Sequence, residues 1–322
     1  MHETMEQFRK HVEMGGREGT ARSHGLALEQ YHGWLLTKGI SNPLRVTTED
    51  IKQYQRWLAE EYRALNKALL QQSTQATRLS SLKSYYGWLM RRGLIFTDVA
   101  RKIVLPKIRR SITAKDHLTL QEVTAILQTQ MKRSTKFVEG SFRWARELEG
   151  LCSLSLAIAC GRRRRSLLDL RTGDLNFERN EVRIEYEKGK PGRVLPVAQW
   201  AMSVTKKYVE SARPILNFHF ENDWLFVGER APQMSETYFS RLIFSIHRET
   251  VRQNPDLTEL ASKHLTPHCL RVSFASLLFR GGCNIRTINE LMDHENLTTT
   301  ARYIPLQLDD LRSACRNAHP RS

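Results

Sequence analysis

Residues 266–303 decide the fold, and they open with Thr266-Pro267-His268-Cys269-Leu270-Arg271. Thr266 is a residue type that caps helices and Pro267 fits a first helical turn, so the stretch predicts a helix that ends at Gly281-Gly282. His268 and Arg271 are three residues apart, which places both on one face near the positive end of that helix. A phosphate binds favourably at such a position.

The same stretch continues with Leu291-Met292-Asp293-His294 and reaches Tyr303 nine residues after His294. The order His-x-x-Arg, then His, then Tyr resembles the tyrosine recombinase family of phage integrases and Xer-type resolvases. The resemblance implies a mainly α fold with a small β-sheet (α+β). It covers about residues 119–311, and the helical block before them is similar to the family's core-binding domain in general pattern.

A second segment, Cys160-Gly161-Arg162-Arg163-Arg164-Arg165-Ser166-Leu167-Leu168-Asp169-Leu170, resembles the family's Thr-Gly-Leu-Arg-x-x-Glu-Leu-x-x-Leu box. The alignment puts the catalytic arginine at Arg163, but the four consecutive arginines Arg162–Arg165 leave the register open by one residue, and Arg162 is the alternative to be tested. The acidic residue that the family has three places after this arginine is replaced by Ser166. Asp169, one turn further on, is an alternative acidic partner for the arginine.

A third segment, Lys188-Gly189-Lys190-Pro191-Gly192-Arg193-Val194-Leu195-Pro196, reads as turn chemistry followed by a returning strand. It pairs with a strand in which Val182, Ile184 and Tyr186 alternate with charged residues. The hairpin resembles the one that carries the family's catalytic lysine. The resemblance places that lysine at Lys188, with Lys190 as the alternative.

The resemblance implies a mechanism for these six residues. Arg163 and Arg271 clamp the non-bridging phosphate oxygens, since a guanidinium binds a phosphate in bidentate fashion. Tyr303 attacks phosphorus and forms a 3′-phosphotyrosyl bond. Lys188 protonates the leaving 5′-oxygen, His268 handles a proton near the tyrosine, and His294 hydrogen-bonds the phosphate. The expected reaction requires no metal and no cofactor.

The composition agrees with a nucleic-acid partner. Lys and Arg outnumber Asp and Glu by 50 to 34, so the formal net charge is +16 and the field attracts polyanions. We find no apolar run of membrane-spanning length and no apolar N-terminal leader, so we expect a cytoplasmic, nucleoid-associated protein without a membrane partner. The five scattered cysteines are expected to be reduced and mostly buried.

The pattern along the chain predicts four parts. We expect a loose N-terminal arm over residues 1–20, a helical DNA-binding domain over 21–105, a basic linker over 106–117 and a catalytic domain over 118–322. In the helical block, apolar residues at helical spacing predict three helices, and Thr47-Thr48-Glu49-Asp50 predicts a cap before the second. The first helix should bury Leu26, Leu28, Tyr31, Trp34 and Leu35.

The end of the chain predicts an assembly. Leu308, Leu311 and Cys315 recur at helical spacing and give the tail an apolar stripe. The resemblance implies that this tail contacts a neighbouring protomer, in a tetramer on two double-stranded DNA sites with inverted repeats. A fold of the tail onto its own domain is the alternative.

Two other functions fit parts of this pattern. A type IB topoisomerase shares the chemistry but relaxes DNA without site specificity. A catalytically silent DNA-binding or architectural protein would keep the basic charge, and the departure at Ser166 is compatible with it. The complete set of active-site residue types in the expected order favours a site-specific recombinase.

Overall fold

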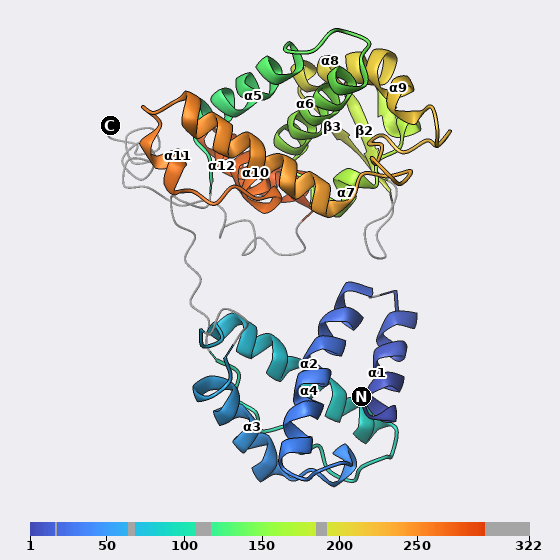
Figure 1. The fold of residues 1–322 in the computed structure, drawn as a ribbon, viewed down its shortest axis with the longest axis vertical. Helices are drawn as coiled ribbons and strands as arrows, with labels where there is room; N and C mark the ends of the chain where they lie inside the picture. The colour runs from blue at the N-terminus through green and yellow to red at the C-terminus, as the bar shows by residue number, and fades with distance from the viewer. Residues whose placement is uncertain (17, 64–67, 107–116, 185–191, 294–322) are drawn as a thin grey trace, which may run out of the picture. The chain divides into compact units, whose positions relative to one another are not determined.

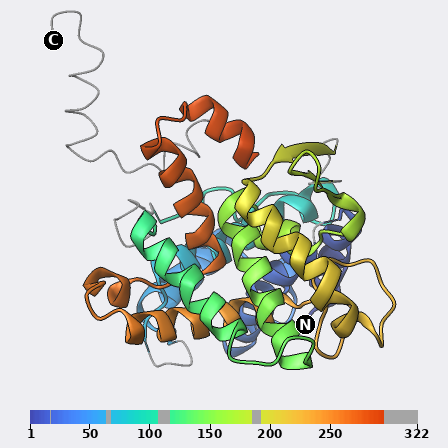
Figure 2. The same cartoon turned by 90° about the horizontal axis from the view of Figure 1, so that it is seen from above.

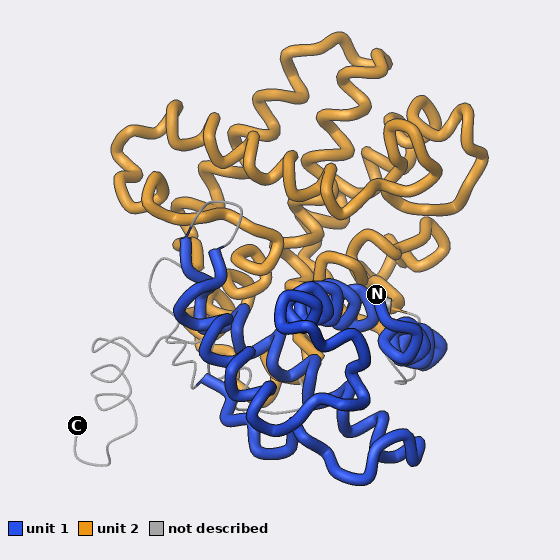
Figure 3. The backbone as a smooth tube through the Cα atoms, turned by 60° about the horizontal axis from the view of Figure 1, so that its bottom comes forward, with its two compact units in different colours: residues 1–110 blue, residues 111–322 orange. Residues whose placement is uncertain are grey.

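The computed structural model describes residues 1–16, 18–63, 68–106, 117–184 and 192–293. The chain divides into two compact units, Met1–Arg110 and Ser111–Ser322, which Figure 3 colours separately. The predicted linker lies almost wholly outside the described residues. Each unit is therefore described by itself.

Unit 1 is helical, as the sequence predicts (Figure 1). Its elements are α1 (Glu3–Met14), α2 (Glu18–Thr37), a 3₁₀ turn (Pro43–Arg45), α3 (Thr48–Glu60) and α4 (Gln72–Arg91). The predicted cap of α3 is confirmed as a full capping box, in which the Thr47 and Asp50 side chains each accept from the other residue's backbone N–H. Gly39 and Gly93 follow α2 and α4 in the left-handed conformation, with φ of 73° and 70°, which explains why glycine ends both helices.

The core of unit 1 is rich in aromatic side chains, and the hydroxyls of several buried tyrosines are hydrogen-bonded. The hydroxyls of Tyr31 and Tyr86 lie 2.9 Å apart, and Tyr86 donates to the carbonyl of Pro43. Tyr54 packs edge-on against Tyr31. Leu28, Trp34 and Leu35 are buried as predicted, whereas Leu26 is 61% exposed. Leu26 lies outside the buried face of α2, which packs against α1 and α4.

The prediction of a loose arm over residues 1–20 is wrong. His2 caps α1, and Met5 and Phe8, three residues apart, are both buried in the core of unit 1. The Thr4 hydroxyl also lies 2.6 Å from that of Tyr85. Only Met5 and Phe8 are buried on this helix, with Val12 partly buried against the same core, and polar residues surround them, which is why the sequence pattern did not reveal the helix.

Unit 2 is also mainly helical, and its small sheet confirms the predicted fold class. Its helices are α5 (Leu120–Ser134), α6 (Phe142–Cys160), α7 (Arg164–Leu168), α8 (Gln199–Lys207), α9 (Arg213–Asn217), α10 (Glu236–Gln253), α11 (Thr258–Ser262), α12 (Pro267–Arg280) and α13 (Ile285–Met292). A 3₁₀ turn (Thr172–Asp174) precedes the sheet, and a π-helical turn (Tyr208–Ala212) joins α8 to α9. Thr119 and Glu122 form a capping box at the start of α5.

The sheet has three short antiparallel strands in the order β1-β2-β3: Leu175–Asn176, Glu181–Ile184 and Arg193–Pro196. Val182 pairs with Leu195 and Ile184 with Arg193. Val182 and Ile184 are buried while the residue between them is exposed, which confirms the predicted alternation. Tyr186 and the turn of the hairpin lie outside the described residues.

Helix α6 is the centre of unit 2 and packs against α5, α8, α9 and α12 (Figure 1). Its buried Glu149 fixes the segment before α10: the carboxylate accepts from the Val227 N–H at 2.7 Å and from Arg146 at 2.8 Å, and lies 3.0 Å from the Tyr208 hydroxyl. Burial raises the pKa of the Glu149 carboxyl, and these donors oppose the rise. These donors stabilise the Glu149 carboxylate, whose burial without partners would cost free energy.

Two further expectations concern the whole described chain. Cys152, Cys160 and Cys269 are free and buried, and Cys283 is free and half-buried, in agreement with the expected reduced thiols. Within the described ranges, every helix is too short or too polar to cross a membrane.

We expect Glu149→Gln to lower the free energy of unfolding by about 3–5 kcal/mol, because it removes the buried charge that pairs with Arg146, whose side chain is 12% exposed. Denaturant unfolding followed by circular dichroism measures the change. Glu210→Gln is the matched control, since Glu210 forms an exposed pair with Lys206 at 3.8 Å, and it should change stability little. Equal effects of the two substitutions would contradict a supporting role for the buried cluster.

Candidate active site

The predicted helix at Thr266 is confirmed as α12, with Thr266 as its N-cap and Pro267 in its first turn. The Thr266 hydroxyl accepts from the Cys269 N–H at 3.1 Å. His268 is exposed in the first turn, where the helix dipole is positive. Arg271, one turn further on, is only 3% exposed.

Arg271 joins two helix ends. Its guanidinium donates to the carbonyl of Gly161 at 2.7 Å and to the carbonyl of Met292 at 2.6 Å. Gly161 is the C-cap of α6 and Met292 is the last residue of α13, so both carbonyls lie where a helix has unsatisfied acceptors and negative partial charge. Arg271 thereby holds Gly161, at the start of the arginine-rich box, and Met292, at the end of α13, next to the first turns of α12.

Gly161 is required at the end of α6 for two reasons. Its φ of 58° is left-handed, and a Cβ atom at this position would collide with the ring of Phe274 on α12. The glycine that the sequence aligns with the family's box therefore permits α6 and α12 to approach closely.

The four arginines after Gly161 do not form one uniform basic patch. Arg162 is buried at 3% exposure, whereas the Arg163 side chain is 51% exposed and its residue is the N-cap of α7. Arg164 contacts Glu236 and Ser240 of α10, and Arg165 lies 3.7 Å from Asp169. Arg162 is thus buried and Arg163 lies at the candidate site. The other two arginines form ion pairs with acidic side chains of unit 2.

Asp169 does not support Arg163 within the described part of the chain. Its carboxylate contacts Arg165 and accepts from Gln233 at 3.0 Å. Cys160, just before the box, is not a competing nucleophile: burial raises the pKa of its thiol to about 12, although the nearby charge of Arg162 opposes the rise.

The end of α13 is the third part of the site. Figure 2 shows α13 folding back beside the end of α12, and Ile288 and Met292 are buried against Ala275 there. Asp293 closes α13 in a left-handed conformation. Arg193, the first residue of β3, donates to the carbonyls of Glu290 and Leu291. The strand that returns from the Lys188 hairpin thus contacts the helix end that leads into His294.

Asp293 and Arg193 were not assigned a role from the sequence. The carboxylate of Asp293 lies 3.8 Å from Nη1 of Arg163 and 3.9 Å from Nη1 of Arg193. The only sequence signal for Asp293 is its place at a helix end, because Asp and Asn tolerate the left-handed conformation there.

The structure therefore brings together Arg163, Arg271 and the residue before His294, with His268 on the same helix as Arg271. Lys188, its alternative Lys190, His294 and Tyr303 lie outside the described residues, and their positions at the site stay predictions.

Comparison with known proteins adds two family matches. Residues 116–308 match the model of the phage integrase family, and residues 5–93 match that of the phage integrase N-terminal SAM-like domain. The chain belongs to the phage integrase family. The first match covers the site segments of unit 2, and the second includes most of α1.

Named relatives of this family extend over most of the chain. A tyrosine recombinase of Thermosipho africanus is 30% identical over 83% of this chain and 86% of its own length. The tyrosine recombinase XerD of Halalkalibacterium halodurans is 26% identical over 97% of this chain and 95% of its own.

Solved structures of the family share the fold. A XerH site-specific recombinase in a post-cleavage complex with a difH substrate has a TM-score of 0.69 at 17% identity, covering 97% of this chain and 83% of that one. The Tn1549 transposon integrase in complex with circular intermediate DNA has a TM-score of 0.64 at 16% identity, covering 96% of this chain and 98% of that one.

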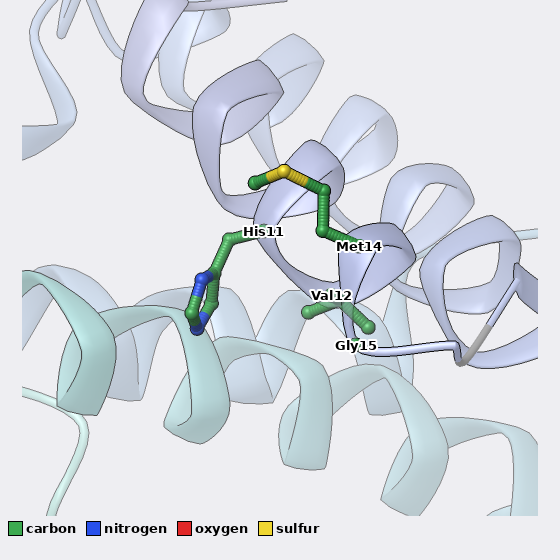
Figure 4. Close-up of a pocket in the computed structure, with 4 residues that line it drawn as sticks. All are labelled: His11, Val12, Met14 and Gly15. Carbon is green, nitrogen blue, oxygen red and sulfur yellow. The ribbon is translucent and has the colours of Figure 1, made fainter.

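A surface hollow in unit 1 does not compete with this site. It has a volume of about 470 Å³ and is lined by His11, Val12, Met14 and Gly15 at the end of α1 (Figure 4). His11 is the one ionisable side chain among its described lining residues, so the hollow offers little chemistry.

We expect Arg163→Leu to slow DNA cleavage about 100-fold or more, because it removes a fixed positive charge from the phosphate. Arg162→Leu should leave the cleavage rate within a few-fold and act mainly on thermal stability, since the Arg162 side chain is buried. Single-turnover cleavage of a nicked DNA substrate and thermal melting separate the two effects. If Arg162→Leu abolishes cleavage and Arg163→Leu does not, the catalytic arginine is Arg162.

Proposed function

We propose that this chain is a site-specific DNA recombinase that cleaves and rejoins DNA through a covalent 3′-phosphotyrosyl intermediate on Tyr303. The convergence of three segments of unit 2 carries the proposal: the Gly161–Arg163 corner, the first turns of α12 and the end of α13 meet through the Arg271 guanidinium. These segments hold Arg163, His268 and Arg271 and lead directly into His294. Family membership and relatives named as tyrosine recombinases support the same activity.

The proposed reaction uses side chains alone. Arg163 and Arg271 stabilise the negative charge that builds on the phosphate oxygens, and a low-dielectric position such as that of Arg271 makes this stabilisation stronger. Tyr303 attacks phosphorus and the bond to the 5′-oxygen breaks, so the phosphodiester energy is kept in the enzyme–DNA bond. Lys188 gives its proton to the leaving 5′-oxygen. His268 handles a proton near Tyr303, and His294 hydrogen-bonds the phosphate.

We further propose that the substrate is double-stranded DNA with inverted-repeat sites, bound by a tetramer across two duplexes in the cytoplasm. The net charge of +16 supports a DNA partner. Neighbouring structures are recombinases solved with DNA, including a XerH with its difH substrate. The tail after Tyr303, with Leu308, Leu311 and Cys315, would contact a neighbouring protomer.

The recombinase proposal is favoured over the two alternatives. The relatives that match almost the whole chain carry the name tyrosine recombinase, which favours neither a topoisomerase nor a silent architectural protein. A supercoiled plasmid without recombination sites tests the topoisomerase alternative directly, since a type IB enzyme relaxes it.

Tyr303→Phe should bind DNA as the unchanged protein does and form no covalent adduct, because phenylalanine lacks the attacking oxygen. A nicked suicide substrate traps the adduct, and denaturing electrophoresis detects it. Tyr238→Phe is the control with a tyrosine on α10, outside the proposed site, and should keep the adduct. A covalent band that persists in Tyr303→Phe would remove Tyr303 from its role.

Cleavage should continue in excess EDTA, since side chains supply the charge stabilisation. DNA affinity should fall steeply with salt as counterions return to the phosphates. The adduct assay, with and without EDTA, and a binding titration at several salt concentrations measure the two effects. Adduct formation that stops with EDTA and returns with magnesium would contradict the proposed chemistry.

A further inference from the structure

The end of α13 has an unusual residue in an unusual conformation. Asp293 has φ of 56° and ψ of 50°, and it is one of three non-glycine residues with positive φ in the described chain. The left-handed region favours glycine because it has no Cβ, and Asp is among the few other residues that tolerate it. A carboxylate therefore stands where a side chain of any kind is disfavoured.

The carboxylate of Asp293 faces two arginines from different elements. Oδ2 lies 3.8 Å from Nη1 of Arg163, and Oδ1 lies 3.9 Å from Nη1 of Arg193. The Asp293 side chain is 14% exposed, so solvent screens these interactions less than it screens a surface pair. One carboxylate thus contacts the first residue of the returning hairpin strand and the arginine proposed to hold the phosphate.

The arginine itself needs a partner that fixes its direction. The Arg163 side chain is half-exposed and projects from the N-cap of α7, and a charged partner on another element limits the rotation of such a long side chain. Ser166, three residues after Arg163, has no charge to hold it, and the nearest acidic residue on the same segment, Asp169, contacts Arg165 instead.

We propose that Asp293 is the positioning residue for Arg163, supplying from the end of α13 a carboxylate that Ser166 does not have and that Asp169 places near Arg165 instead. The proposal rests on the proposed function, in which Arg163 binds the scissile phosphate. A guanidinium has five N–H donors in a planar fork, and the Asp293 contact is at Nη1. A charged contact at one nitrogen limits the rotation of the whole planar fork, which is the role of a positioning residue for a phosphate ligand.

Two substitutions separate this role from a helix-capping role. Asp293→Asn keeps the size and the tolerance for positive φ but removes the charge. Asp293→Gly also removes the charge, and it suits the left-handed backbone better, so its melting temperature should equal or exceed that of the unchanged protein. If Asp293 orients Arg163, both variants should form the Tyr303 adduct roughly 10- to 100-fold more slowly, because small misplacements of a catalytic group have effects of this size.

The assay is single-turnover adduct formation on a nicked suicide substrate at saturating DNA, with the dissociation constant measured in parallel. The dissociation constant should change by less than about threefold, since one contact among many phosphate contacts is affected. Asp169→Asn is the matched control and should keep the unchanged rate. Ser166→Glu in the Asp293→Asn background should restore much of the lost rate, because residues three apart on a helical turn are neighbours.

Each outcome decides between specific possibilities. An Asp293→Gly variant that is stable and cleaves at the unchanged rate would show that Asp293 only ends α13, and would overturn the proposal. A slow Asp169→Asn with an unchanged Asp293→Asn would assign the role to Asp169 instead. The unchanged protein is assayed beside the variants. If it forms no adduct, the proposed function itself is contradicted, and this outcome is distinct from a failure of the role proposed for Asp293.

Discussion

Two hydrogen bonds from the buried Arg271 guanidinium hold the candidate site together. They end on the carbonyls of Gly161 and Met292, which belong to the last turns of α6 and α13. Helix ends that have no capping partner inside a protein are costly, and two such ends share one cation here. The positions of Arg163 and Asp293 follow from this arrangement, because Arg163 comes two residues after Gly161 and Asp293 follows Met292.

This arrangement affects how mutations of Arg271 should be interpreted. Removing its side chain would delete a proposed phosphate ligand and would also leave two buried carbonyls without their donor. Lysine would keep the charge but lose the planar fork that serves both carbonyls. A loss of cleavage in such a variant therefore combines chemistry with structure, whereas Arg163, which is half-exposed, allows the chemical contribution to be examined more directly.

Sequence patterns predicted the elements whose signals are local. The caps at Thr47 and Thr266 were visible because each is a contiguous arrangement of a few residue types, and both are confirmed. Helix α1 was missed because its contribution to the core depends on Met5 and Phe8 meeting side chains far along the chain. The ion pairs of Asp293 were missed for the same reason: they join residues 130 and 100 positions apart, and no local pattern encodes them.

Helix α1 also determines how the protein can be handled at the bench. The sequence pattern alone suggests that the first twenty residues could be removed. Their removal would expose the aromatic core of unit 1 around Tyr85 and delete the Thr4 hydroxyl that is hydrogen-bonded to the Tyr85 hydroxyl. A purification tag or fluorescent label is safer when its attachment leaves His2 free to cap α1. A shortened protein that precipitates would thus report a broken core and would say nothing about the reaction that the intact chain performs.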